Sequence, residues 1–194
     1  MDDQLYRAIC KQINALCPLD AAVLDAFLDS WEEVSVKRKA VLTRAGEREH
    51  YMYIVLEGVQ HAVVAHGDKE ATLVFTYPYS FSGVIDSFLL QQPANCRLEC
   101  ITASRLLRMS HRTLLQLIDE YPVLETWLWK SLAGVLAGTL QRQAELLTFT
   151  AAEKVTALLR RSPQVLNLIP HKYLASYIGV DASTFSKMLG SVRV

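Results

Sequence analysis

Long apolar runs are missing from this sequence of 194 residues. Hydrophobic residues make up 51% of it, enough for a sizeable core, yet no run approaches the roughly 20 residues that cross a bilayer. The first residues, Met-Asp-Asp-Gln, are acidic and lack the apolar centre of a secretory signal. We therefore expect a cytoplasmic protein with no membrane partner.

Cysteine is also scarce. Neither Cys10 and Cys17 nor Cys96 and Cys100 have the Cys-x-x-Cys spacing of common metal and redox motifs. An iron–sulfur or zinc site would need the two pairs to converge in space. In a reducing compartment the thiols stay free, and small buried side chains are the favoured interpretation. We predict no metal site.

Motifs of catalysis are absent as well. The sequence has no nucleophile elbow, no phosphate-binding Walker loop, no metal-spaced set of His and Cys, and no convincing pair of catalytic carboxylates. We therefore predict no enzyme, no catalytic residue and no resident cofactor.

The chain has no net charge, since 20 Lys and Arg balance 20 Asp and Glu, but the charge is uneven. Residues 151–194 hold six Lys or Arg and two acids, an excess of four positive charges, so residues 1–150 carry the matching negative excess. A basic tail on an acidic body suits a module that approaches phosphates, although a chance excess of this size on a solvated face is the plain alternative.

Hydrophobic periodicity outlines the elements. Apolar residues recur every three to four positions over residues 4–30, which predicts two short helices separated at Pro18, the second capped by Asp20. From Trp31 the period changes to two, and glycines separate apolar segments that predict antiparallel strands in a sandwich or barrel. The expected strands include 34–36, 51–56, 60–65, 71–77 and the strand-like segment 97–109, with a hairpin at Gly67-Asp68 and a loop and short helix over 77–90.

A long helix is predicted from Tyr121-Pro122 to about Leu147, because no proline interrupts it. One apolar stripe along it suits a dimer interface; its members are Leu124, Leu128, Leu132, Val135 and Thr139. The alternative is that the stripe packs only on its own chain. Thr150 then caps a further helix, Ala151 to Arg161, with Glu153 in the capping-box position.

Residues 171–190 are typical of a helix-turn-helix. Leu174 and Ile178 would face a core, Gly179 suits the left-handed turn, and Asp181 caps the next helix. The outer face of that second helix would meet the DNA major groove, and it holds Ser183, Thr184, Ser186 and Lys187. It contains no arginine, so base reading would rest on hydroxyls and one lysine. A two-helix hairpin with a polar surface is the alternative.

The order of elements and four motifs give the chain a resemblance to the Crp/Fnr superfamily of bacterial transcription factors, over nearly its whole length. The motifs are Leu42-Thr-Arg-Ala-Gly-Glu47, Tyr53-Ile-Val-Leu-Glu-Gly58, Phe81-Ser-Gly83 and Ile169-Pro-His-Lys-Tyr-Leu-Ala-Ser-Tyr-Ile-Gly179. The resemblance implies an α+β fold with a β-roll (a double-stranded jelly roll) as sensor in residues 1–119, a dimerisation helix in 120–148 and a DNA-binding domain in 149–194. It also implies double-stranded DNA, a second copy of the chain and RNA polymerase as partners.

Cyclic-nucleotide-binding members of this family carry a Gly-Glu pair in the phosphate loop and an arginine some ten residues later. Here Gly83 follows Ser82, but Val84 stands at the glutamate position and Ala94, followed by Asn95, at the arginine position. Arg97 lies three residues further on, an odd offset that reverses the face of a strand. We predict that these six residues line a pocket that does not bind cyclic AMP, leaving a more apolar, unidentified effector or no ligand at all.

Phosphate contacts are expected from Lys172 and Arg193 beside the recognition helix. The β-hairpin wing typical of the family would have to be missing or formed earlier, for example by Val165 to Ile169. The leading interpretation is a dimeric transcription regulator. The alternative is a small-molecule-binding or protein-interaction module whose helix-turn-helix has lost its affinity for DNA.

Overall fold

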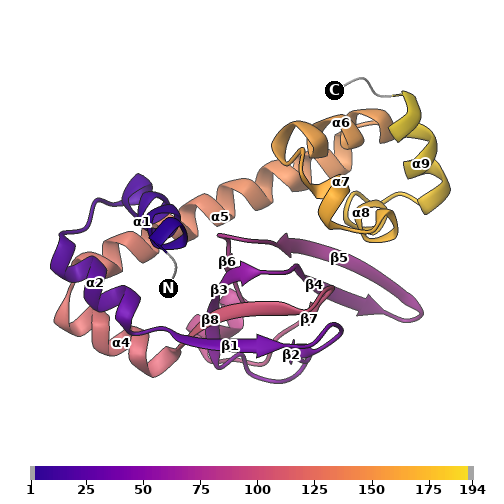
Figure 1. Ribbon diagram of the computed structural model, residues 1–194. Coiled ribbons are helices and arrows are strands. Elements are labelled where there is room, and N and C mark those ends of the chain that lie inside the picture. Colours follow the sequence, from indigo (N-terminus) through magenta and orange to yellow (C-terminus); the bar gives the residue numbers. More distant parts are fainter. Residues whose placement is uncertain (1–2, 192–194) are drawn as a thin grey trace.

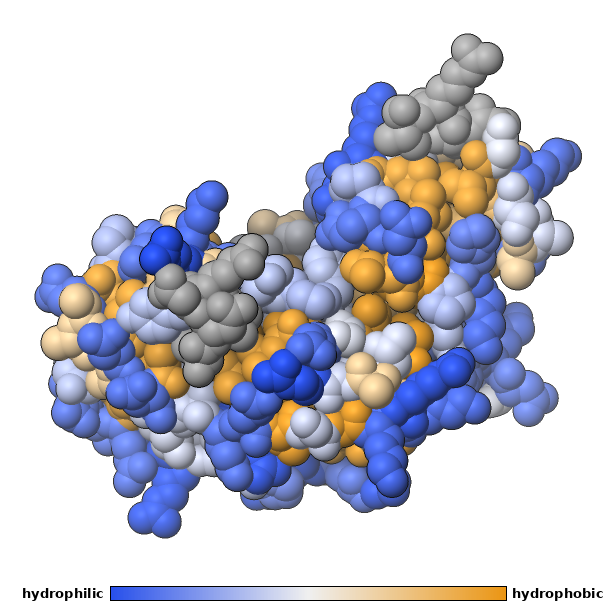
Figure 2. All heavy atoms as spheres, viewed as in Figure 1, coloured by the Kyte–Doolittle hydropathy of each residue, from blue (hydrophilic) through white to orange (hydrophobic). Residues whose placement is uncertain are grey.

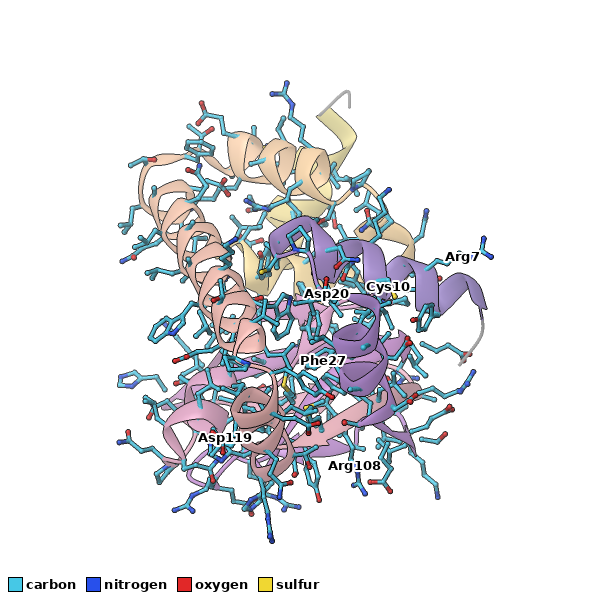
Figure 3. All side chains as sticks on the ribbon, turned by 90° about the vertical axis from the view of Figure 1, so that its left-hand side faces the viewer. Arg7, Cys10, Asp20, Phe27, Arg108 and Asp119 are labelled. Carbon is cyan, nitrogen blue, oxygen red and sulfur yellow. The ribbon has the colours of Figure 1, made fainter. Side chains whose placement is uncertain are left out.

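The computed structural model describes residues 3–191 (Figure 1). Two short helices come first, α1 (Asp3–Leu16) and α2 (Ala21–Asp29), as the periodicity predicts. Phe27 of α2 points toward the long helix α5 (Val123–Thr148), where its ring lies 5.2 Å from that of Trp127 (Figure 3). Asp20 occupies the N-cap position of α2, but its side chain makes no capping hydrogen bond, so its predicted capping role is wrong.

Eight antiparallel strands form the roll. The first sheet has the order β1-β8-β3-β6 and the second β2-β7-β4-β5. Strand-like residues 97–109 contain two strands joined by a turn rather than one. The strands are β1 (Glu32–Val36), β2 (Val41–Thr43), β3 (Tyr51–Glu57), β4 (Gln60–His66), β5 (Lys69–Thr76), β6 (Phe81–Ser82), β7 (Arg97–Cys100) and β8 (Ser104–Ser110).

Strand β3 is apolar from Met52 to Leu56 because both of its faces are buried there. Met52, Ile54 and Leu56 pack into one core with α1, α2, α4 (His111–Glu120) and the start of α5. Tyr53 and Val55 point the other way, into the roll interior. The alternation of side chains along a strand thus serves two separate cores.

The C-terminal unit follows α5, which crosses from the N-terminal helices to this unit (Figure 1). It contains α6 (Ala151–Arg161), α7 (Val165–Leu168), α8 (His171–Tyr177) and α9 (Ala182–Ser191). The Thr150–Glu153 capping box is confirmed. The segment proposed as a wing is instead helical, with the Ile169 N–H bonded to the Val165 carbonyl at 2.9 Å, so that proposal is wrong.

A third core joins the C-terminal unit to the roll. Val59 and Ile101 of the roll are buried with residues of all four C-terminal helices, and Phe75 and Tyr77 pack against the same cluster. The short helix α3 (Ile85–Leu90) follows β6 and buries Phe88 in the core that α1 and α2 share. Among residues 3–191, no helix combines the length and apolar character that a membrane crossing requires.

Candidate functional site

The outer face of α9 is exposed at the end of the molecule, on the far side of α8 from the roll (Figure 1). Gly179 has φ of 68°, as its turn position predicts, and Phe185 is fully buried beneath α9. Lys187 is exposed and takes part in no hydrogen bond, ion pair or ring contact with the described residues. The ammonium group of Lys187 is therefore available to contact another molecule.

Asp181 caps α9, as predicted, and in doing so engages two of the expected DNA-contacting hydroxyls. Its carboxylate accepts hydrogen bonds from Thr184 N at 2.7 Å, Thr184 Oγ1 at 2.6 Å and Ser183 Oγ at 2.5 Å. The side-chain hydrogen bonds from Ser183 and Thr184 lower the pKa of Asp181. Ser186 donates to the Ala182 carbonyl. The three hydroxyls therefore donate within the chain, and their oxygens remain available as acceptors.

Lys172 is exposed and lies at the side of α8 that borders the roll. Its Nζ lies 4.7 Å from the ring centroid of Tyr173, and it lines a cleft with His61, Glu70 and Arg97 of the roll. Arg193, the other expected phosphate contact, lies outside the described residues. Of the predicted cations, Lys187 is thus the one that the described structure places on the outer face.

The phosphate-loop positions of the roll are apolar and closely packed. Val84 is 4% exposed and Ala94 3% exposed, and both belong to the cluster inside the roll with Leu98 and Leu106. Ser82 Oγ lies 2.9 Å from Thr76 Oγ1, within hydrogen-bond distance. No charged group stands at either position where a cyclic nucleotide would need one.

A carboxylate that the sequence did not single out lies beneath this loop. Glu49 is 1% exposed, and its Oε2 accepts hydrogen bonds from Thr43 Oγ1 at 2.5 Å and from Val84 N at 3.3 Å. Tyr51 N donates to Oε1 at 3.2 Å. Burial raises the pKa of Glu49, while the hydrogen bond from Thr43 opposes that shift. The N–H of Val84 is therefore already satisfied by a carboxyl group of the chain itself.

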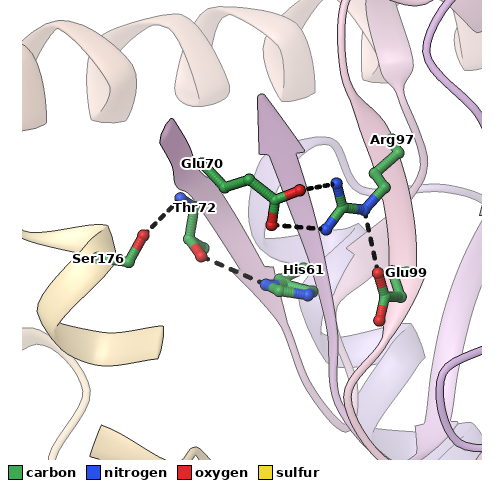
Figure 4. Close-up of polar contacts among 6 residues, drawn as sticks. All are labelled: His61, Glu70, Thr72, Arg97, Glu99 and Ser176. Carbon is green, nitrogen blue, oxygen red and sulfur yellow. Dashed lines mark hydrogen bonds and ion pairs between the residues drawn. The ribbon is translucent and has the colours of Figure 1, made fainter. Parts of the chain in front are cut away.

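Arg97 points away from the loop. Leu98 and Cys100 are buried on the inner side of β7, whereas Arg97 lies on the opposite side and binds Glu70 with both terminal nitrogens, at 2.5 and 2.9 Å (Figure 4). Its Nε binds Glu99 at 3.0 Å. Asn95 is exposed, and the predicted place of Arg97 and Asn95 in a ligand pocket stays a prediction.

A separate cavity of about 480 Å³ lies between β1, β2 and β3. It is lined by Val34, Leu42, Glu49 and Tyr51, and by Arg108, whose guanidinium is 4.7 Å from the Tyr51 ring and 2.9 Å from a Glu32 oxygen. The arginine is paired, which weakens its hold on an anion. This cavity has room for a small ligand.

Polar contacts hold α8 against the roll edge. Thr72 N of β5 donates to Ser176 Oγ at 3.0 Å (Figure 4), and buried His61 lies edge-on to the Tyr173 ring at 4.8 Å. Arg142 of α5 donates to carbonyls on both sides, those of Leu73 on β5 and Tyr177 on α8. Sequence reasoning missed Arg142, for which the one local signal is a cation inside an apolar helix.

The predicted dimer stripe lies partly inside the chain. Leu124 is fully buried in its own core and has no surface for a partner, so that assignment is wrong, and Leu128 packs against the same core. Leu132 is half-buried, while Val135 is 57% exposed and Thr139 is also exposed. The largest exposed apolar side chains of α5 form another stripe, which we call the α5 seam; it consists of Trp129, Leu136, Leu140 and Leu147.

Potential metal ligands do not gather within the described part of the chain, where no group of three or more His, Cys, Asp or Glu side chains is placed to hold an ion. Cys17 lies in the N-terminal core and Cys96 inside the roll, so the two cysteine pairs do not converge. Burial raises the pKa values of Cys10, Cys96 and Cys100, and all four thiols are free.

Comparison with known proteins agrees with this architecture. Residues 33–121 match the cyclic nucleotide-binding domain family, and no curated protein matches the chain by sequence. FixK2 from Bradyrhizobium japonicum superposes with a TM-score of 0.72 at 16% identity, covering 83% of each chain. The c-di-GMP responsive global regulator CLP from Xanthomonas campestris gives 0.68 at 18% identity, covering 89% of this chain and 91% of that one.

The catabolite activator protein of Thermus thermophilus is a further neighbour, with a TM-score of 0.60 at 22% identity over 91% of this chain and 84% of that one. The match to the cyclic nucleotide-binding domain family spans the roll and helix α4. The chain as a whole shares the fold of these three proteins, as the resemblance drawn from the sequence implies.

Proposed function

We propose that this protein is a dimeric, DNA-binding transcription regulator of the Crp/Fnr type. The observation that carries the proposal is the free outer face of α9, with Lys187 unpaired, at the end of a chain that has the fold of these regulators. In this proposal residues 1–119 are the sensor, 120–148 the dimerisation helix and 149–194 the DNA-binding domain.

Dimerisation through the α5 seam is supported by its spacing. Trp129 and Leu136 are seven residues apart, as are Leu140 and Leu147, and Leu136 and Leu140 are four apart, the pattern of a coiled coil. These four side chains are 56 to 77% exposed in the single chain. Burying each against a second copy would contribute about 1–2 kcal/mol, since a fully exposed large apolar side chain contributes about 1.5–3 kcal/mol.

Leu140→Glu tests the seam. It places a charge at the centre of the proposed interface and is expected to yield monomers in sedimentation equilibrium at concentrations where the unaltered protein is dimeric. Leu115→Glu is the matched control, because Leu115 is 48% exposed on α4 and is not part of the α5 seam. A dimer that survives Leu140→Glu and not Leu115→Glu would contradict the seam.

We further propose that the roll does not respond to cyclic AMP. The ribose and phosphate of a cyclic nucleotide would meet Val84 and Ala94, and the nearby Val84 N–H is engaged by Glu49. A sugar hydroxyl left unpaired there would cost roughly 1–3 kcal/mol. Isothermal titration with cyclic AMP and cyclic GMP is expected to give no saturable heat, and micromolar binding would overturn this part of the proposal.

DNA binding is tested by recovering and sequencing the genomic fragments that the purified protein retains. A shared palindrome with half-sites about one helical turn apart is expected from paired recognition helices. Lys187→Glu is expected to abolish the enrichment, and Lys11→Glu, the same charge change at an exposed position on α1, to leave it intact.

The second candidate is an interaction module that has lost its affinity for DNA. It is favoured by the ionised carboxylate of Asp181 at the start of α9, which repels phosphates, and by the lack of arginine on that helix. Retention of no common motif, with no effect of Lys187→Glu, would support this candidate over the regulator.

A further inference from the structure

A crevice separates the roll from the C-terminal unit. On the roll side its walls are the β1–β2 turn and the β7–β8 turn, and on the other side the segment from α7 to the start of α8. Its volume is about 540 Å³, within the range of small-molecule sites. In Figure 2 a hydrophobic area runs from the C-terminal helices down to the adjoining edge of the roll. We call this space the interdomain crevice.

The interdomain crevice is apolar with a cationic rim. Ile101 and Ile169 line it and belong to the buried core between the two units, and Leu168 is 36% exposed beside them. Arg38 and His171 also line it, and among the described residues no carboxylate does. The surroundings therefore favour a ligand with an apolar body and a negative end.

The guanidinium of Arg38 is free to receive that negative end. Within the described structure it makes no hydrogen bond, ion pair or ring contact, whereas Arg97, Arg105 and Arg108 of the same roll each bind a glutamate. Lys37 and Lys39 flank it, both exposed, and their side-chain ammonium groups likewise have no partner among the described residues. Three successive cations make this turn strongly positive.

We propose that the interdomain crevice binds a small amphiphilic carboxylate, of the kind represented by a medium-chain fatty acid. The hydrocarbon chain lies against Ile101, Leu168 and Ile169. The carboxylate receives the fork of Arg38 N–H groups, a geometry that guanidinium and carboxylate share. His171 stands beside it as a second donor. The alkyl chain supplies affinity in proportion to the area it buries.

A ligand in this position would contact both units at once. His171 is the first residue of α8, and its ring lies 5.5 Å from that of Phe185, the buried anchor of α9. Occupancy would therefore favour the arrangement in which α8 is docked on the roll and would set the position of α9. This regulatory consequence rests on the proposed function, whereas the binding site itself does not.

The test is isothermal titration of the full chain with sodium octanoate, 1-octanol and sodium acetate. Octanoate is expected to bind saturably at one molecule per chain. Octanol lacks the charge, and acetate lacks the hydrocarbon chain. Each is expected to bind at least about tenfold more weakly than octanoate, because octanol loses a charge-assisted hydrogen bond and acetate loses several buried methylenes. Equal binding of octanoate and octanol would overturn the proposal.

Variants locate the site. Arg38→Gln is expected to weaken octanoate binding about tenfold, and Leu168→Asp to weaken it further by placing a negative charge in the crevice. Lys37→Gln, one residue away and not lining the crevice, is the matched control. Because Arg38 and Leu168 are exposed, both variants should fold, which circular dichroism checks. Unchanged affinity in Arg38→Gln would refute the site.

DNA retention with and without octanoate separates the two proposals. Saturable, Arg38-dependent octanoate binding by a protein that retains no DNA motif would uphold the site and refute the regulator. Motif recovery with no octanoate binding would do the reverse.

Discussion

Arg142 is the residue through which the long helix ties the roll to the C-terminal unit. Its Nη2 donates to the Tyr177 carbonyl of α8 at 2.8 Å and to the Thr72 carbonyl of β5 at 3.3 Å, and its Nη1 donates to Leu73. The guanidinium also lies 3.7 Å from the Tyr177 ring centroid. Burial lowers the pKa of Arg142, which shows that the charged form bears a desolvation cost.

Arg142→Met keeps the apolar stem and removes all of these donors. Each hydrogen bond from a charged donor contributes roughly 1.5–3 kcal/mol, and relief of the desolvation cost returns part of the total. We expect the free energy that couples the two units to fall by about 2–4 kcal/mol, within the range of severe single substitutions. Arg142→Lys, which retains the charge but cannot serve carbonyls on both sides, is expected to fall in between.

Differential scanning calorimetry measures this coupling. The unaltered protein is expected to unfold in one transition because a shared core joins the roll to the C-terminal unit. Arg142→Met is expected to unfold in two, the C-terminal unit first. Lys130→Met, on an exposed position of the same helix, is the control. The role assigned to Arg142 would be refuted if Arg142→Met unfolded in a single transition at the same midpoint temperature as Lys130→Met.

Three further predictions concern stability. Burial lowers the pKa of His61, so the unfolded chain binds the proton more readily than the folded chain. The stability that neutral His61 contributes is therefore complete above the ordinary histidine pKa of about 6.5, and it is lost as the pH falls below that value. Chemical unfolding at pH 7.5 and 5.5 should therefore show a smaller pH effect in His61→Gln, and an equal effect would exclude His61 as the cause. Thr150→Ala removes a capping box and should lower the free energy of unfolding in urea by about 1 kcal/mol. An unchanged free energy of unfolding would contradict a stabilising role for the cap. Gly58→Ala should lower the free energy of unfolding by more than about 2 kcal/mol, because the new Cβ would lie 2.5 Å from the Ala103 carbonyl oxygen at φ of 90°. Gly46→Ala, at a similar φ but in open space, should lower it by about 1 kcal/mol. Equal losses in the two variants would refute the steric argument.

Local features were predictable because neighbouring residues create them. The Thr150–Glu153 capping box, the left-handed Gly179 and the Asp181 cap each depend on residues within three or four positions, and all are present. Asp20 shows the limit of such reasoning. It sits at the correct position, but its side chain makes no capping bond, because a suitable residue type does not by itself fix a rotamer.

Side-chain direction on the long helix was harder to predict. A periodic stripe shows that one face is apolar, but not whether its own chain or a partner covers that face. Leu124 and Leu128 pack on the N-terminal helices of the same chain, and the α5 seam lies elsewhere on the helix. The exposed Trp129 and Leu147 belong to the α5 seam, although the sequence alone does not show that these two side chains are exposed.

The sequence by itself determined the order of the elements, the glycines of the turns and the missing charges at Val84 and Ala94, because these are properties of residue identity and near neighbours. The tertiary structure decided the rest. It brought Glu49 to the Val84 N–H across 35 positions and paired Arg97 with Glu70 across 27. It also placed Arg142 between two units. Such contacts depend on the path of the chain, which decides the partners that come within hydrogen-bond distance of each polar group.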